Sequence, residues 1–598
     1  MFGGTEVAHV IGDLNGTGQY LHWSILTISE ANLVVVALMF VIFFLAIVVR
    51  FPRGDDVAPE TDAPSAGVDD ESGAHGWTGR LRVAWLRVLP PGKLLPDTQP
   101  AYVASWVYVF GVGSLAALAV VVVSGVLIAF GGVDWWHTHA IGHFINSLHL
   151  WSVELFMAFM VIHLWAKFWM AAWRGGRAKT WITGVLAFIA SVVEAFTGYL
   201  SQQNFDSQWI ATNGKDAFNG VGTGAFFNLM NFGQMLLWHI VLLPIVLIAL
   251  IGGHVLLVRA KGVVQPLSVS AAVANKASRS ERRKARKESD GAYWKGRRRH
   301  YDIVKEGSIA CVVAIVATVV LAAVFSSPDD PAVTIQAWSQ AQPGDFVGTA
   351  ANELAGTTET AMYGPPYSDG TANVQSVAVS WQKLAGKRIQ VDPPDDFVLN
   401  PLAHVAPVDR PLAAALKQYN AASSDQQQTW LTAYTTALPN ATVGTDSVSV
   451  PGTGFGPVPV LMNTELTLAQ NGALDSTLVA NNGFYGTDFT KPLLFLEDGT
   501  YYASLAQQAH LTGTQWGVTN ETGNYPGQPW LWLYQLWYQI GPIGGSSSAD
   551  VWAIYFTFLA TLLLTLVPFI PGVRDIPRWI PVHRLIWRNF KPDPPKED

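Results

Sequence analysis

Seven long apolar stretches interrupt the polar sequence, and each is long enough to cross a lipid bilayer. A transmembrane helix needs about 20 apolar residues to span the hydrocarbon core. The stretches lie at about residues 24–50, 103–130, 144–172, 180–200, 230–258, 303–326 and 550–572. The pattern therefore predicts an all-α membrane protein whose two ends lie on opposite sides of the membrane.

Basic residues flank the spans unevenly, and this asymmetry predicts the orientation. The first 23 residues contain no Lys or Arg, whereas Arg50 and Arg53 follow the first span, and residues 173–180 and 279–300 are also basic. Because cytoplasmic loops are enriched in Lys and Arg, we expect the N-terminus outside and the C-terminus in the cytoplasm of a multi-pass cell-membrane protein. The net charge of −7 averages a basic cytoplasmic face and an acidic exterior, so we expect a lipid partner and no nucleic acid.

Composition divides the chain into membrane and extramembrane segments. We expect an N-terminal transmembrane helix (1–50), a cytoplasmic linker (51–102), a block of four spans (103–262), a basic cytoplasmic connector (263–302), a transmembrane helix (303–326), an extracytoplasmic domain (327–549), a transmembrane helix (550–572) and a cytoplasmic tail (573–598). The extracytoplasmic segment is large enough to fold independently, and 411–438 and 464–480 within it have helical patterns. Its fold and ligand do not follow from the sequence.

Two of the predicted spans each carry two histidines. His149 and His163 are 14 residues apart in the third span, and His239 and His254 are 15 apart in the fifth. Fourteen residues make almost four helical turns, so both histidines of a helix share a face and stand about 21 Å apart. Both spans run from outside to inside, so His149 is expected to face His239 near the outer surface and His163 to face His254 near the inner one. Each facing pair fits the two axial positions of a heme iron.

Other roles for these histidines are possible in principle. A lone transmembrane histidine is more often a hydrogen-bonded packing residue, but four at matched depths favour ligands. Zinc needs four ligands clustered at one level, which a separation of nearly four turns excludes. A heme-free bundle with a transporter-like polar core stays open. Cys311 is the only cysteine, which excludes an intramolecular disulfide and a c-type heme motif in this chain.

Paired glycines repeat the histidine spacing in the other two spans of the block. Gly111 and Gly125 lie in the second span, Gly184 and Gly198 lie in the fourth, and each pair is 14 residues apart. Glycine lets a backbone and a flat ring approach closely. The shared period indicates that these positions make room for a porphyrin between the helices.

Three further motifs accompany these glycines: "SLH…H", "TGYL" followed by "WIATN" (197–213), and "LWHIVLLP…GGH". With these features, residues 103–262 resemble the N-terminal four-helix half of cytochrome b from cytochrome bc complexes. The histidine spacings are closest to the split, chloroplast-type version. The resemblance implies a diheme bundle holding two heme b groups, one ligated by His149 with His239 and the other by His163 with His254.

The chain departs from this family at three points. The family usually has an arginine, which pairs a heme propionate, three residues before the first ligand, where this chain has Asn146. After "GYL" the chain reads "SQQNFDSQW" (201–209) instead of a Pro-Trp stretch leading to a quinol-binding helix, and the Pro-Glu-Trp-Tyr motif of the second half of cytochrome b is not found. An outer quinol-oxidation site of the bc type is therefore in doubt.

The function predicted by the resemblance is a diheme subunit of a respiratory quinol or quinone oxidoreductase complex. It would move electrons across the membrane between a quinone, menaquinone or similar, and a partner with an iron–sulfur or c-type cytochrome center. Two intramembrane carboxyls, Glu194 and Glu154, are candidate catalytic proton carriers. An alternative is a heme-wired anchor for an extracytoplasmic dehydrogenase, without quinone chemistry of its own. The cluster His137, His139 and His143 is interpreted as surface residues of an outer loop.

Overall fold

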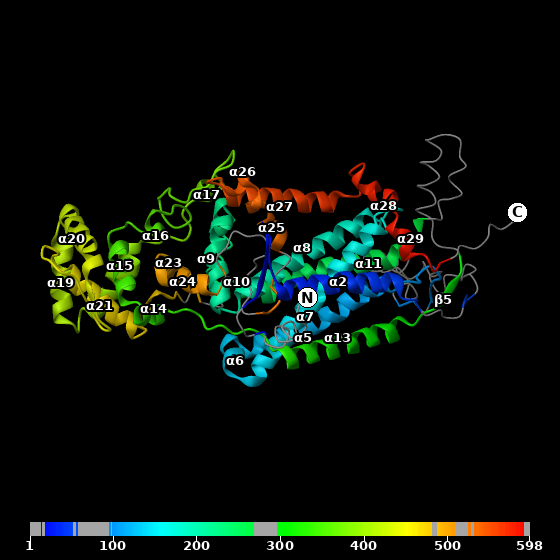
Figure 1. Cartoon of the computed structure of the whole chain (residues 1–598), viewed down its shortest axis with the longest axis horizontal. Helices are drawn as coiled ribbons and strands as arrows, with labels where there is room; N and C mark the ends of the chain where they lie inside the picture. Colours follow the sequence, from blue (N-terminus) through cyan, green and yellow to red (C-terminus); the bar gives the residue numbers. More distant parts are fainter. Residues whose placement is uncertain are drawn as a thin grey trace, which may run out of the picture. The chain divides into compact units, whose positions relative to one another are not determined.

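The computed structural model describes most of the chain. The described residues are 14, 18–24, 26–51, 56–57, 95–96, 98–267, 296–480, 487–509, 511, 524–527 and 531–590. Most of the predicted linker, much of the basic connector and the last eight residues therefore lie outside the described part. The described chain is mainly helical and carries only short strands (Figure 1).

Seven helices of the described chain are long and apolar enough to cross a membrane, which confirms the predicted spans. They are α2 (Glu30–Val48), η2 with α5 (Trp106–Gly131), α7 (Ala140–Trp169), α8 (Ala178–Leu200), α10 through α11 (Phe232–Lys261), α13 (Ile303–Phe325) and α27 (Ala549–Leu566). The first helix begins later than predicted because β1 (Tyr20–Trp23) and β2 (Leu26–Ser29) form an antiparallel hairpin before it.

Contacts divide the chain into two compact units. The bundle unit contains residues 34–193, 242–327 and 559–598, and the domain unit contains residues 1–33, 194–241 and 328–558. The boundary passes through α2, α8, the fifth span and α27, so each of these helices contributes to both units.

In the bundle unit, α5 (Val109–Gly131) packs along α7, and α13 packs against both of them. The N-terminal half of α7 is hydrogen-bonded to the end of α13. Trp151 Nε1 donates to the Ser326 carbonyl over 2.7 Å, and the Ser147 and Ser327 hydroxyls are 2.9 Å apart. Asn146, at the position where the related family has arginine, donates to the Ser327 hydroxyl over 3.3 Å. The sixth span is thus an integral part of the bundle.

The remaining elements of the bundle unit are short. They are η2 (Trp106–Tyr108), α6 (Val133–Thr138), η10 (Val573–Asp575), α28 (Ile576–Trp579), α29 (Val582–Ile586) and an antiparallel sheet in which β5 (Arg298–His300) lies between β3 (Asp56–Val57) and β4 (Thr98–Pro100). In this sheet Gln99 pairs with Arg299.

The domain unit is built from short helices around one apolar core. The core joins the C-terminal end of α8 and helix α9 (Phe205–Gly220) to residues 333–511, and a cluster of buried rings, Trp338, Phe346 and Phe495, lies within it. The helices of residues 328–558 are α14 (Ile335–Ala341), α15 (Pro343–Leu354), α16 (Glu359–Met362), α17 (Trp381–Ala385), a π-helical segment (Pro394–Leu399), α18 (Asn400–Val405), α19 (Arg410–Ala421), α20 (Ser424–Ala437), η7 (Leu438–Asn440), α21 (Val458–Gln470), α22 (Ala473–Leu478), α23 (Thr490–Glu497), α24 (Thr500–Gln508), α25 (Trp532–Leu536), η9 (Trp537–Gln539), α26 (Gly541–Gly544) and the first half of α27. Strands β6 (Thr442–Val443) and β7 (Val448–Ser449) form a small hairpin.

Each of the two helical patterns predicted in this domain is broken once. The segment 411–438 forms α19 and α20, because Ser423 is extended and caps α20 by accepting from the Gln426 amide. The segment 464–480 belongs to α21 and α22, which are separated by Gly472 with φ of 73°. A polar cap and a left-handed glycine therefore set boundaries that the apolar periodicity does not reveal.

Candidate functional site

Each of the four predicted glycines faces the imidazole of one predicted histidine. A Cβ atom at Gly111 would lie 3.0 Å from Cε1 of His163, and one at Gly125 would lie 3.0 Å from Cε1 of His149. The corresponding distances are 2.9 Å from Gly184 to His254 and 2.5 Å from Gly198 to His239. All four are tighter than an ordinary van der Waals contact, so the glycines make room for the imidazoles. Their predicted contact with a porphyrin stays a prediction.

The second ring nitrogen of three of these histidines is held by a backbone carbonyl. Nδ1 of His149 lies 3.1 Å from the Val121 oxygen, Nδ1 of His239 lies 3.0 Å from the Glu194 oxygen, and Nδ1 of His254 lies 2.9 Å from the Thr180 oxygen. A carbonyl only accepts, so each Nδ1 carries the proton and the lone pair resides on Nε2. This tautomer and its fixed ring orientation are those of a metal-ligating imidazole.

Hydroxyl residues next to the glycines complete this arrangement, and they were missed in the sequence. Ser124 precedes Gly125, and its Oγ lies 3.0 Å from Nδ1 of His149. Thr183 precedes Gly184, and its Oγ1 lies 3.4 Å from Nδ1 of His254. Thr197 precedes Gly198 and donates to the Glu194 carbonyl, which also binds His239. A Ser or Thr directly before three of the four glycines is a signal that the sequence contained.

The fourth glycine breaks this rule. Gly111 follows Phe110, which has no hydroxyl, and Nδ1 of His163 is buried with no hydrogen-bond partner among the described residues. His163 is therefore the least constrained of the four imidazoles.

A π-helical turn accommodates the longer histidine spacing in the fifth span. The five residues Trp238–Leu242, which include His239, form this turn between α10 (Phe232–Leu237) and α11 (Leu243–Lys261). A π turn takes up about one residue more than an α turn, and such bulges are frequent at functional sites. The turn thus compensates for the 15 residues between His239 and His254, compared with 14 in α7.

His163 and His254 both belong to the bundle unit, and their pairing stays a prediction. The ammonium group of Lys167, one helical turn after His163, lies 4.8 Å from the centroid of the Tyr108 ring. His149 belongs to the bundle unit and His239 to the domain unit, so their pairing stays a prediction.

The two predicted carboxyls have different surroundings. Glu194 lies beside His239, with its Oε1 3.4 Å from Nδ1 of His239, and its Oε2 is buried without a hydrogen-bond partner in the described chain. Glu154 lies half-buried on α7, one and a half turns after His149. The structure therefore places Glu194, of these two, in contact with a candidate ligand.

The cluster of His137, His139 and His143 is held by local contacts. The His137 ring stacks on Trp136 at a centroid distance of 3.6 Å, and Nε2 of His143 lies 3.0 Å from the Ser326 hydroxyl. Nδ1 of His139 lies 2.9 Å from the Thr138 hydroxyl. No group of three or more possible metal ligands occurs in the described part of the chain.

The stretch 201–209, where the chain departs from the expected pattern, is hydrogen-bonded to the segment that follows α13. Gln208 donates to the Val333 carbonyl over 3.1 Å and accepts from the Val333 amide over 2.8 Å. Two residues earlier, burial and the nearby Asp330 raise the pKa of Asp206 to about 7. Further along α9, Lys215 is 3% exposed and forms an ion pair of 2.7 Å with Glu497. These residues are therefore used to hold the domain on α9.

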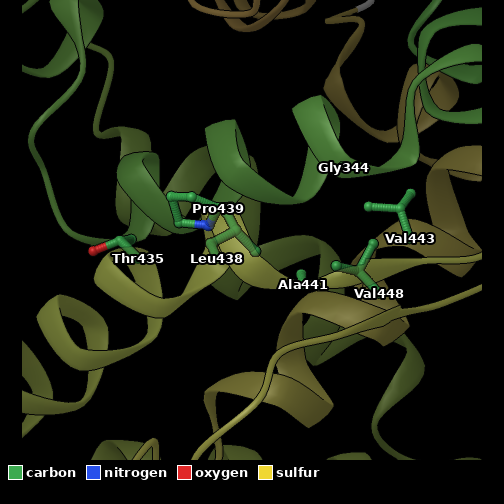
Figure 2. Close-up of a pocket in the computed structure, with 7 residues that line it drawn as sticks. All are labelled: Gly344, Thr435, Leu438, Pro439, Ala441, Val443 and Val448. Carbon is green, nitrogen blue, oxygen red and sulfur yellow. The ribbon is translucent and has the colours of Figure 1, made fainter.

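A shallow apolar cavity lies elsewhere in the domain unit (Figure 2). Its volume is about 250 Å³, and it is lined by Gly344, Thr435, Leu438, Pro439, Ala441, Val443 and Val448. None of these side chains is titratable, so this cavity offers no acid, base or nucleophile.

The four histidines fit the requirements of heme ligation. The Nε2 lone pairs of His149, His239 and His254 suit iron, a glycine leaves space beside each of the four rings, and the surrounding helices are apolar.

Three of the four histidines, His163, His239 and His254, lie in a segment that matches a known family. Residues 154–332 match the family model described as cytochrome b (N-terminal)/b6/petB. Over 152 residues the chain is 30% identical to cytochrome b6 of Chlamydomonas reinhardtii, with 23% of this chain and 70% of the relative covered. Cytochrome b6 of Heliomicrobium gestii is 27% identical over 137 residues, which cover 21% of this chain and 64% of the relative's length. The menaquinol:cytochrome c reductase cytochrome b subunit of Geobacillus thermodenitrificans is 25% identical over 140 residues, covering 21% of this chain and 62% of the relative.

Proposed function

Since this chain belongs to the cytochrome b family of bc-type complexes and is a membrane electron-transfer subunit, we propose that it carries two b hemes and exchanges electrons with a quinone. In this proposal His149 and His239 ligate one heme and His163 and His254 ligate the other. Four imidazoles, each set against a glycine, are the observation that carries the proposal. The family implies heme b as the cofactor.

Heme iron supplies one-electron transfer between its ferric and ferrous states. The chain's own contribution is to fix the ligands. Carbonyl groups of α5 and α8 hold the imidazoles of His149, His239 and His254 in one tautomer, which directs their Nε2 atoms away from the backbone. Glycines in the same two helices keep these rings close to the helix axis.

A quinone is the proposed small-molecule partner. A menaquinol:cytochrome c reductase subunit is among the relatives of this chain, which supports menaquinone or a similar quinone. The unpartnered Oε2 of Glu194 beside His239 suits a group that accepts or supplies the proton that accompanies quinone chemistry. Glu154 is the second proposed proton carrier.

The family supports a proposal for the partner subunits, and the distribution of basic residues supports one for the orientation. We propose that the N-terminus lies outside, that the C-terminus is cytoplasmic, and that an iron–sulfur or c-type cytochrome subunit exchanges electrons with this chain. The extracytoplasmic domain is the proposed docking region for that subunit. Asn146 and Gln208 are bound to Ser327 and Val333, which supports a site rearranged relative to the family pattern.

Heme stoichiometry tests the proposal. We expect the purified full-length protein to contain two b hemes, and His163→Ala and His254→Ala variants to contain one. His404→Ala, at an exposed position of α18 in the domain unit, is the matched control and is expected to keep both hemes. A pyridine hemochrome assay with protein quantification measures the ratio. A protein that lacks heme, or a His163→Ala variant that keeps two hemes, contradicts the assignment.

The second candidate function is a heme-wired anchor for an extracytoplasmic dehydrogenase. It is favoured by the use of residues 201–209 to hold the domain, at the place where the family has its quinol-binding stretch. Reoxidation of the reduced protein by a menaquinone analogue separates the two functions. Fast reoxidation supports quinone exchange, and none supports the anchor.

A further inference from the structure

Four large apolar side chains gather on the surface of the domain unit near α17. They are Phe226, Val379, Trp381 and Leu384, which are 63%, 39%, 44% and 71% exposed. Phe226 ends the 3-10 turn η3 (Thr223–Ala225), and α17 packs on that turn and on α9. A gathered apolar patch of this kind usually marks an interaction surface.

Hydrogen bonds fix this patch against the first turns of α27, which Figure 1 shows beside α17. Gln375 donates to Asp550 over 2.6 Å, and the Ser376 amide donates to the Ser548 hydroxyl over 3.0 Å. Trp381 Nε1 donates to the Tyr555 hydroxyl over 2.6 Å. All these residues belong to the domain unit, and α27 is a membrane-spanning helix.

The contact with Tyr555 sets the depth of the patch. Tyr555 lies six residues after the start of α27, which corresponds to about 9 Å along the helix. The same part of α27 carries a group of aromatic rings, in which Phe556 lies 5.3 Å from Trp537 and 5.7 Å from Trp552. Tyr and Trp are enriched at the boundary between headgroups and acyl chains, so this level of α27 is typical of that boundary.

Positive charge borders the apolar residues. The Arg388 guanidinium lies 5.3 Å from the centroid of the Phe226 ring, and Lys383 is exposed on α17 between Trp381 and Leu384. Cations next to interfacial aromatic and aliphatic side chains favour contact with lipid phosphates. The positive charges of Arg388 and Lys383 therefore favour a phospholipid surface, and not an apolar protein groove, as the partner of this patch.

We propose that α17 and η3 form an interfacial foot, in which Phe226, Trp381 and Leu384 insert into the lipid leaflet around the start of α27 while Lys383 and Arg388 meet its phosphates. The occupant of the patch is thus lipid. The foot fixes the extracytoplasmic domain to the membrane surface as well as to α27. It does not depend on heme binding.

Site-directed spin labelling of the full-length protein tests the foot. In a Cys311→Ala background, Leu384→Cys and Phe226→Cys place labels on its two elements. Val408→Cys places a control label on an apolar residue that is 86% exposed in the same unit, next to α19, which lies far from α27 in Figure 1. Power saturation is measured with oxygen and with a water-soluble nickel chelate, in nanodiscs containing neutral and anionic phospholipids.

The expected result is a several-fold higher oxygen-to-nickel accessibility ratio at 384 and 226 than at 408. If the labels at 384 and 226 are as accessible to the nickel chelate as a label in water, the proposed lipid contact is wrong. Labels at 384 and 226 that are shielded from both reagents would also overturn it, because they would show that protein covers the patch.

Discussion

The backbone oxygen of Glu194 accepts the hydrogen bond from Nδ1 of His239 over 3.0 Å, while the carboxyl Oε1 of the same residue lies 3.4 Å away. The main chain, and not the side chain, therefore fixes the imidazole. This separation of roles leaves the carboxyl available for other chemistry.

Replacing Glu194 by Gln should therefore leave heme content unchanged but slow the reoxidation of reduced heme by a menaquinone analogue. A catalytic acid or base typically contributes about 100-fold or more to a rate. Stopped-flow absorbance in the heme alpha band measures the rate. Glu306→Gln, at the exposed start of α13, is the control. An unchanged rate in Glu194→Gln would assign this residue to packing.

Adding a methyl group at Gly198 should displace the His239 ring, because the new Cβ would lie 2.5 Å from Cε1. Overpacking of this kind typically costs about 1–3 kcal/mol. We expect Gly198→Ala to lose much of one heme. Gly252→Ala is a matched control in α11, since nothing lies within 4 Å of its Cβ position. The measurement is the heme-to-protein ratio of the two variants. Equal ratios would show that heme binding does not require glycine at position 198.

A hydroxyl supplied at residue 110 should bind the orphaned Nδ1 of His163, as Ser124 does for His149. A hydrogen bond that Nδ1–H donates to a hydroxyl oxygen makes Nε2 a stronger ligand and stabilises ferric iron. Phe110→Ser is expected to lower one heme potential by about 40 mV, which corresponds to about 1 kcal/mol for a one-electron couple. Potentiometric titration of the two hemes provides the measurement. A shift to higher potential would contradict the expected orientation of the hydroxyl.

Glu465 in α21 should make the domain unit less stable as the pH rises. Its side chain is fully buried, neither carboxyl oxygen has a hydrogen-bond partner in the described structure, and burial raises its pKa well above the ordinary value. The folded state thus keeps a proton that the unfolded chain releases above its ordinary pKa. Stability is greatest below that value and falls by about 1.4 kcal/mol per pH unit above it.

Replacement by Gln removes this proton linkage. We expect the opening free energy of α21 in Glu465→Gln, measured by hydrogen exchange of the full-length protein between pH 6 and 8, to depend less on pH than in the parent chain. The exposed residue Glu359 gives the control variant Glu359→Gln. Equal pH dependence in parent and Glu465→Gln would mean that the buried carboxyl is already ionised.

The sequence by itself determined the seven spans, the family and the four histidines with their glycines. These features are periodic and local, because a helix converts spacing along the chain into a shared face, and a bilayer requires a minimum apolar length. Residues 149, 163, 239 and 254 could therefore be selected without coordinates.

Only the tertiary structure decided what holds those residues in place. The carbonyl oxygens of Val121, Glu194 and Thr180 are present in any sequence, and only the packing of one helix against another brings them to an imidazole nitrogen. The contact of Trp381 with Tyr555 joins residues 174 positions apart, a pairing that no periodic pattern encodes. Long-range polar contacts depend on the path of the whole chain, and this is why they were not predicted.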